Sequence, residues 1–183
     1  MKSINRSVAP TACSGSVFLA ALALAGLGAG SAMADAVQWR TEDGGNGHWY
    51  EVVEDEMNWF EADDLAAARG GYLITITSSS ENQLLCNAGL PDDGGRPYWT
   101  GGIREGGSWS WRNGESWGYS NWDGIEPNGC CGYGGYGADF MVWRPWHNVA
   151  ICGWDDTNPF YCSDDPGCTP RTLIEFSADC NGD

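Results

Sequence analysis

The chain has 183 residues, of which 9 are Lys or Arg and 25 are Asp or Glu, so its formal net charge is −16 at pH 7. This acidic balance excludes a protein that binds nucleic acid by pairing basic side chains with phosphates. Eleven Trp, seven Tyr and five Phe, with charged residues at only 19%, exclude intrinsic disorder, and the length suits one domain.

The N-terminal segment has the pattern of a secretory signal. Lys2 and Arg6 are its only charged residues, an apolar run covers residues 17–25, and Ala32-Met33-Ala34 has the form of a signal-peptidase site. A membrane anchor would need about 20 apolar residues, and several glycines break this run. We therefore expect residues 1–34 to be removed from a protein that is extracellular, periplasmic or on the cell surface, with no membrane insertion of the mature chain.

Cysteine usage agrees with export. The chain has eight cysteines, and loss of Cys13 with the signal leaves an odd number. Disulfides are the default in an oxidising compartment, so one thiol is left free or links two chains into a dimer. Most of the remaining cysteines lie within residues 130–168 and are expected to form disulfides that hold a long loop region together.

The first half of the expected domain mixes strands with helices. Residues 48–53 and 72–76 are rich in aromatic and β-branched residues and predict strands. Asn58, with a Glu three residues later, predicts a capping box that opens a helix, which ends at Gly70-Gly71. Ser78 begins a second Ser-x-x-Glu pattern, which predicts another capping box and a short helix through residue 85.

The second half consists of short apolar segments separated by Gly, Asn and Asp. Residues 98–103, 109–111, 140–143 and 173–176 are its strand candidates. Two helices followed by antiparallel strands predict the α+β class. The stretches between the middle and last candidates are longer than ordinary connections, and such loops in compact domains are usually functional or disordered.

The order of these segments resembles the C-type lectin domain, in the form found in secreted bacterial proteins. The matching residues are 59–76, 78–85, 98–102, 107–111, 121–128 and 173–176. The resemblance implies a double-loop fold in which the N- and C-terminal strands pair and two helices pack on short antiparallel sheets, with a long Cys- and Gly-rich loop. The chain then divides into a signal (1–34), an N-terminal lead (35–46), the domain (47–176) and a tail (177–183).

Glu126-Pro127-Asn128 matches a family motif whose two side chains bind calcium across a cis proline. Calcium takes about 6 to 8 oxygen ligands, so carboxylate and amide oxygens can share its shell with sugar hydroxyls. The resemblance thus implies that Glu126 and Asn128 bind calcium and sugar, with calcium as the cofactor. It also implies mannose- or glucose-type sugars, whose hydroxyls are equatorial.

A later Trp-Asn-Asp segment completes the calcium site in the family. Residues 154–156, Trp-Asp-Asp, are assigned to it, so Asp155 and Asp156 become calcium ligands and Asp155 also a sugar contact. Residues 146–148, Trp-His-Asn, compete for this place but offer no carboxylate. The family has one more calcium ligand, a Glu, and this chain has Ala138 in its place. Either the extra charge of Asp155 compensates for the missing ligand, or the calcium site is weak or lost.

The cysteine pattern also departs from the family. Ala66 and Ile174 occupy the two places of a bridge that the family usually has. The disulfides must therefore differ from those of the family and lie within residues 130–168, with Cys86 and Cys180 as outlying candidates. The sequence leaves their connectivity open.

Tyr133 and Tyr136 lie in a Gly-rich segment of the long loop. Tyr presents a flat apolar face with a hydroxyl, which suits stacking on a sugar ring, although a flexible spacer is an equal interpretation. Four tryptophans, by contrast, are expected to lie mostly in the core: Trp99, Trp109, Trp111 and Trp122.

The expected function is a non-enzymatic, calcium-dependent module that binds carbohydrate or glycoprotein. The alternative is a calcium-independent protein-interaction or structural module of the cell surface with the same fold. An enzyme is not indicated, because the common acyl-transfer and zinc-protease patterns are missing and His48 and His147 lie far apart. A zinc cluster of Cys130, Cys131, His147 and Cys152 has irregular spacing for such a site.

Overall fold

The computed structural model describes residues 36–88, 90, 96–130, 132–145, 152–161 and 169–177. The expected signal, nearly all of the expected tail and the competing segment 146–148 lie outside these residues. Among the described residues, no helix combines the length and the apolar character needed to span a bilayer.

Local capping begins both helices. Helix α1 (Trp59–Ala68) starts at Asn58, whose side chain accepts hydrogen bonds from the backbone of residues 60 and 61, while Glu61 accepts one from the Asn58 N–H. The predicted capping box is thus confirmed. Helix α2 (Ser79–Asn87) has only half of its predicted box, because Ser78 caps the backbone of Glu81 but the Glu81 carboxylate accepts from Thr77 instead.

Within the described residues, eight strands form one mixed sheet. In chain order they are β1 (Val37–Gln38), β2 (Trp49–Val53), β3 (Tyr72–Leu73), β4 (Tyr98–Glu105), β5 (Ser108–Trp111), β6 (Phe140–Arg144), β7 (Gly153–Thr157) and β8 (Arg171–Phe176). The main path runs β1-β2-β8-β4-β6-β7, with β3 on β8 and β5 on β4. Strands β2 and β8 pair antiparallel, as the resemblance implied, but β4 and β8 run parallel, so the sheet is not wholly antiparallel.

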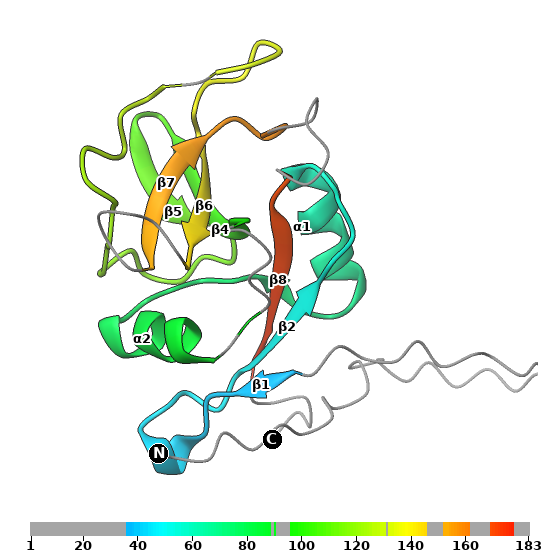
Figure 1. Cartoon of the computed structure of the whole chain (residues 1–183), viewed down its shortest axis with the longest axis vertical. Coiled ribbons are helices and arrows are strands. Elements are labelled where there is room, and N and C mark those ends of the chain that lie inside the picture. The colour runs from blue at the N-terminus through cyan, green and yellow to red at the C-terminus, as the bar shows by residue number, and fades with distance from the viewer. Residues whose placement is uncertain are drawn as a thin grey trace, which may run out of the picture.

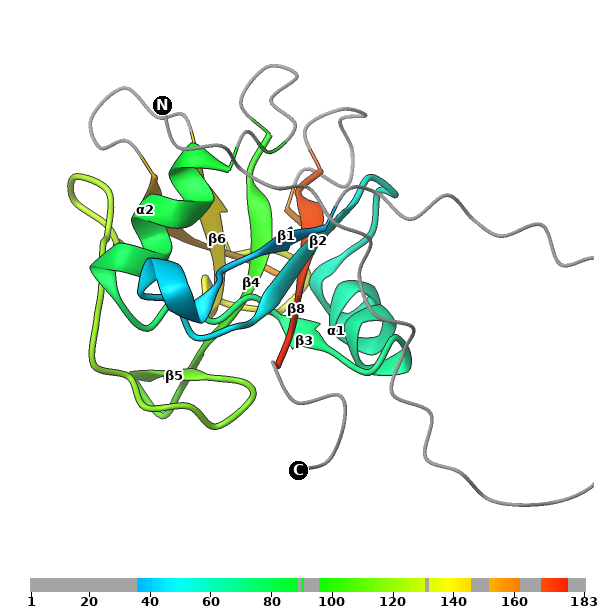
Figure 2. The ribbon, with the colours of Figure 1, turned by 90° about the horizontal axis from the view of Figure 1, so that it is seen from below.

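The two helices lie on opposite sides of β2 and β8 (Figures 1 and 2). Side chains of a strand alternate between its two faces, so β8 contributes side chains to two apolar clusters, one on each face. Leu173 belongs to the apolar cluster that includes Leu85 of α2, and Ile174 to the cluster that includes Ala66 of α1. Ala66 and Ile174, which replace the family's bridge, are thus both fully buried in one apolar cluster.

Four elements differ from the sequence-based expectation. Strand β7 lies where a loop was expected. Its two aspartates have a low strand propensity, but pairing with β6 outweighs it. Strand β1 and a 3-10 turn (Thr41–Asp43) occupy the expected lead, and β1 pairs with β2, so the sheet begins before residue 47. The strand expected over 72–76 ends at Leu73. The α+β class itself is confirmed.

A disulfide joins Cys86 of α2 to Cys152 just before β7, with 5.9 Å between their Cα atoms. The disulfide therefore joins Cys86, one of the two outlying candidates, to the cysteine-rich region of residues 130–168. Cys130 is also disulfide-bonded. With Cys130 and Cys152 both in bridges, a zinc cluster built on them loses two ligands.

Two of the four tryptophans expected in the core are buried, and the other two lie at its edge. Trp99 and Trp111 are buried, whereas Trp109 and Trp122 are half-buried and pack against the cluster on the α2 side.

Candidate functional site

The Glu-Pro-Asn segment forms a tight bend in the long loop between β5 and β6. The Glu126–Pro127 peptide is cis, as the resemblance implied. The Asn128 backbone N–H donates to Glu126 Oε2 at 3.0 Å, and the Asn128 side-chain Nδ2 donates to Glu126 Oε1 at 2.8 Å. The two side chains therefore lie against each other on one side of the bend.

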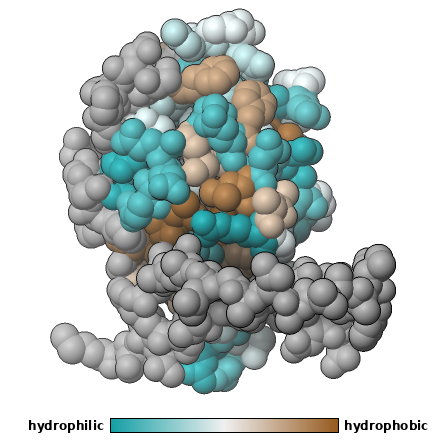
Figure 3. Space-filling view, turned by 90° about the vertical axis from the view of Figure 1, so that its right-hand side faces the viewer, coloured by the Kyte–Doolittle hydropathy of each residue, from teal (hydrophilic) through white to brown (hydrophobic). Residues whose placement is uncertain are grey.

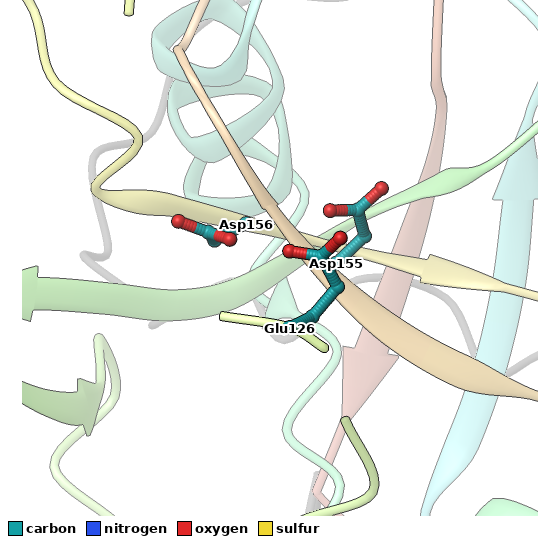
Figure 4. Close-up of side chains that lie close together, drawn as sticks. All are labelled: Glu126, Asp155 and Asp156. Carbon is teal, nitrogen blue, oxygen red and sulfur yellow. The ribbon is translucent and has the colours of Figure 1, made fainter. Parts of the chain in front are cut away.

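Strand β7 brings two further carboxylates to this bend. Asp156 accepts from the Asn128 N–H at 2.8 Å and from the Gly129 N–H at 2.9 Å, so it ties the loop to the strand. Glu126, Asp155 and Asp156 each offer an oxygen, and these oxygens lie within 4.8 Å of one another (Figure 4). The fold thus gathers three carboxylates from two distant segments.

Burial and neighbouring carboxylates together disfavour the charged form of Glu126. Its pKa is raised to about 7, mainly because partial burial penalises the charged form, and further through its hydrogen bond with Asp156 and the nearby charge of Asp155. A carboxyl group that resists ionisation beside two others indicates a site that a cation would stabilise.

Arg144 at the end of β6 forms an ion pair with Asp155. The guanidinium also donates to the Tyr161 hydroxyl at 3.0 Å, and its central carbon lies 5.9 Å from the centroid of the Tyr161 ring. The extra charge that Asp155 carries in place of the family's Asn is therefore offset in part by a fixed cation. Sequence reasoning missed Arg144, because its link to Asp155 depends on the β6–β7 register.

Two features depart from a complete family-type calcium site. The Asn128 side-chain oxygen accepts from the Cys130 N–H at 2.6 Å, so one of its two lone pairs is already used within the loop. Ala138, in the place of the family's Glu, is 1% exposed and offers no side-chain oxygen.

The two tyrosines that are expected to stack on a sugar lie together in the long loop. Tyr133 and Tyr136 bridge each other through their backbones and are 53% and 44% exposed. The Tyr136 ring packs on Phe60 and Phe160, with 5.6 Å between ring centroids in both cases. Tyr136 lines a pocket that contains none of the four expected calcium ligands.

A protein-family model described as the lectin C-type domain matches residues 55–149, just over half of the chain. The chain belongs to the C-type lectin domain family. Domains of this family are generally non-enzymatic and bind carbohydrate.

This C-type lectin domain is similar to curated animal proteins. It is 31% identical over 130 residues to the regenerating islet-derived protein 3-alpha of Mus musculus, covering 63% of the chain and 70% of the relative. It is 30% identical over 125 residues to a snaclec salmorin of Gloydius brevicauda, covering 64% and 77%. These relatives come from animals and do not support the bacterial form of the family.

Solved structures confirm the fold of this C-type lectin domain. The C-type lectin CEL-I from Cucumaria echinata superposes with a TM-score of 0.56 at 16% identity, covering 70% of this chain and 89% of that chain.

Proposed function

We propose that this C-type lectin domain binds carbohydrate through a calcium ion held by Glu126, Asn128, Asp155 and Asp156. The convergence of three carboxylate oxygens within 4.8 Å carries the proposal. Calcium accepts hard oxygen ligands in flexible numbers, so it can bind these residues and two neighbouring sugar hydroxyls together. The Glu-Pro-Asn order supports mannose- or glucose-type sugars, which Glu126, Asn128 and Asp155 would contact directly.

The exposed Tyr133 is the better of the two tyrosines for stacking on the sugar. Its side chain is more exposed than that of Tyr136, which packs into an aromatic cluster. We therefore include Tyr133 in the proposed sugar site and assign Tyr136 to the separate pocket.

The proposal places the domain outside the cytoplasm. The signal pattern of residues 1–34 supports secretion, with the lectin domain over residues 47–176 in the mature chain. Single lectin sites of this kind bind weakly, so avidity through several copies would strengthen binding, and the odd cysteine offers a route to a disulfide-linked dimer.

Glycan binding tests the proposed site directly. Glu126→Ala is expected to lower calcium-dependent binding to mannose-type glycans at least about tenfold, because one charged ligand of the ion is lost. EDTA should abolish binding by the unsubstituted protein. Glu115→Ala is the matched control, since Glu115 is exposed in the same long loop and, among the described residues, forms its hydrogen bonds with Asn113. Glycan arrays with and without calcium measure both effects.

The second candidate function is a calcium-independent protein-interaction module with the same fold. Two observations favour this alternative. Ala138 is buried and offers no side-chain oxygen ligand, and Arg144, paired with Asp155, places a cation beside the proposed calcium site. A ligand that binds only the native state raises its melting temperature. Glycan binding that survives both EDTA and Glu126→Ala would contradict the calcium site. A melting temperature that does not rise in millimolar calcium would support the alternative.

The raised pKa of Glu126 predicts a pH-dependent calcium affinity. In the calcium-free protein, protonated Glu126 stabilises the fold below the ordinary value of 4.5, and this contribution is lost as pH rises through about 7. Calcium requires the ionised form, so binding near pH 6 should release a proton, and affinity should fall as pH decreases below about 7. Calorimetric titrations in buffers of different ionisation enthalpy measure the proton release. An affinity that is constant from about pH 8 to 5 would show that Glu126 is not a ligand.

A further inference from the structure

A second concave site lies away from the carboxylate cluster. It is a pocket of about 560 Å³ between the first turns of α1, the β4–β5 hairpin and the start of β6 with the loop before it. None of the four proposed calcium ligands lines it. Figure 3 shows the side of the molecule that carries α1, where hydrophobic residues are visible among hydrophilic ones.

One wall of the pocket is aromatic. Phe60 is 37% exposed and Tyr136 is 44% exposed, and their ring centroids lie 5.6 Å apart. Phe140, which also lines the pocket, packs against Phe60 with 5.5 Å between ring centroids and an edge-to-face angle of 77°. The rings are therefore held in place by one another, and they present an apolar surface that is already formed.

Apart from Trp59 and Ile103, the remaining residues that line the pocket are charged, and most of these charges are paired. The Arg104 Nε atom lies 2.8 Å from Asp139 Oδ1, and the Arg112 Nε atom lies 3.2 Å from Asp63 Oδ2. Each ion pair is neutral as a whole, so the two pairs add no net charge to the pocket.

Two carboxylates at the pocket have no such partner. The side chains of Asp64 and Glu105 make no hydrogen bond or ion pair within the described residues, and both residues are exposed. The pocket therefore carries an uncompensated negative charge beside a preformed aromatic wall.

We propose that this pocket binds a lysine or arginine side chain of a basic partner protein. The apolar stem of such a side chain would lie against Phe60 and Tyr136, and its charged end would reach Asp64 and Glu105. Aromatic faces attract cations through the ring quadrupole, which adds to the attraction of the carboxylates. A neutral sugar would leave both carboxylates uncompensated, and an anion would be repelled.

The overall charge of the chain favours the same class of partner. A net charge of −16 attracts basic proteins over distances of about a Debye length and speeds their association. The inference goes beyond the proposed calcium-dependent function, because the pocket shares no residue with the calcium site and should act equally well without the ion.

Binding of a short lysine peptide tests the proposal. The probe is an acetylated and amidated tetralysine peptide, titrated into the full domain in EDTA and followed by NMR chemical shifts or calorimetry. We expect saturable binding that weakens as salt is added, and we expect Asp64→Asn/Glu105→Gln to lower the affinity about tenfold. Phe60→Leu keeps the apolar contact but removes the ring, and should lower the affinity about threefold.

A matched variant separates a specific site from general attraction. Asp43→Asn/Asp55→Asn also removes two exposed carboxylates, but at positions outside the pocket, and it should leave peptide affinity within about twofold of the unsubstituted value. Equal losses in both double variants would overturn the proposal, as would unsaturable peptide binding or tighter binding of a neutral sugar in this pocket. Because all measurements are made in EDTA, failure of the calcium site would not affect them.

Discussion

Replacing Trp154 with alanine is expected to lower the free energy of unfolding by about 3–5 kcal/mol. Trp154 lies on β7, is fully buried, and its ring contacts those of four others, which are Trp111, Trp117, Tyr119 and Trp122. Its backbone N–H also donates to the Asn121 carbonyl at 2.8 Å. Removal of the ring would leave a large cavity between the sheet and the long loop that carries Glu126.

Urea unfolding followed by fluorescence measures this loss. Trp154→Phe should be much milder, because the space stays largely filled and the Trp154 Nε1 has no hydrogen-bond partner to lose within the described residues. Trp109→Ala is a second control, since Trp109 is half-buried. If Trp154→Ala and Trp109→Ala were equally mild, the aromatic cluster would not hold the loop on the sheet.

Loss of the Cys86–Cys152 disulfide is the second large expected effect. The bridge closes a segment with a sequence separation of 66 residues, and the chain-entropy relation predicts a stabilisation of about 4 kcal/mol. It also ties α2 to the turn before β7 and so restrains the strand that carries two proposed ligands.

Cys86→Ala/Cys152→Ala tests this contribution more cleanly than reduction, because Cys130 is also disulfide-bonded and would be reduced too. The double variant should unfold at lower urea concentration, by an amount that corresponds to about 2–5 kcal/mol. Addition of a reductant to the double variant then reports the remaining bridges separately. An unfolding midpoint equal to that of the unsubstituted chain would mean that the bridge contributes nothing to stability.

Local signals in the sequence identified several elements well. The Asn58 capping box predicted the start of α1 to the residue, because capping depends on side chains within one turn of the helix. The second capping pattern was only half right. There the Glu81 side chain is fully buried and accepts from the Tyr50 hydroxyl at 2.6 Å, a contact with a distant strand that no local pattern reveals.

Strand β7 illustrates what local patterns cannot decide. Its Asp155 and Asp156 disfavour a strand by propensity, yet they pair with Val142 and Met141 of β6. Pairing with a neighbouring strand supplies hydrogen bonds that outweigh the weak preference of single residues. The same register brings Arg144 next to Asp155.

The sequence by itself determined the family, the class of fold and both helices, and it pointed to the residues of the proposed calcium site, Glu126, Asp155 and Asp156. These features depend on residue order and short-range spacing, which a chain carries before it folds. Only the tertiary structure decided that the carboxylates converge, that Arg144 pairs with one of them, and that Phe60 and Tyr136 share a second pocket with Asp64. Each of these depends on how distant segments are packed, because side-chain contacts across a sheet follow from strand order and register.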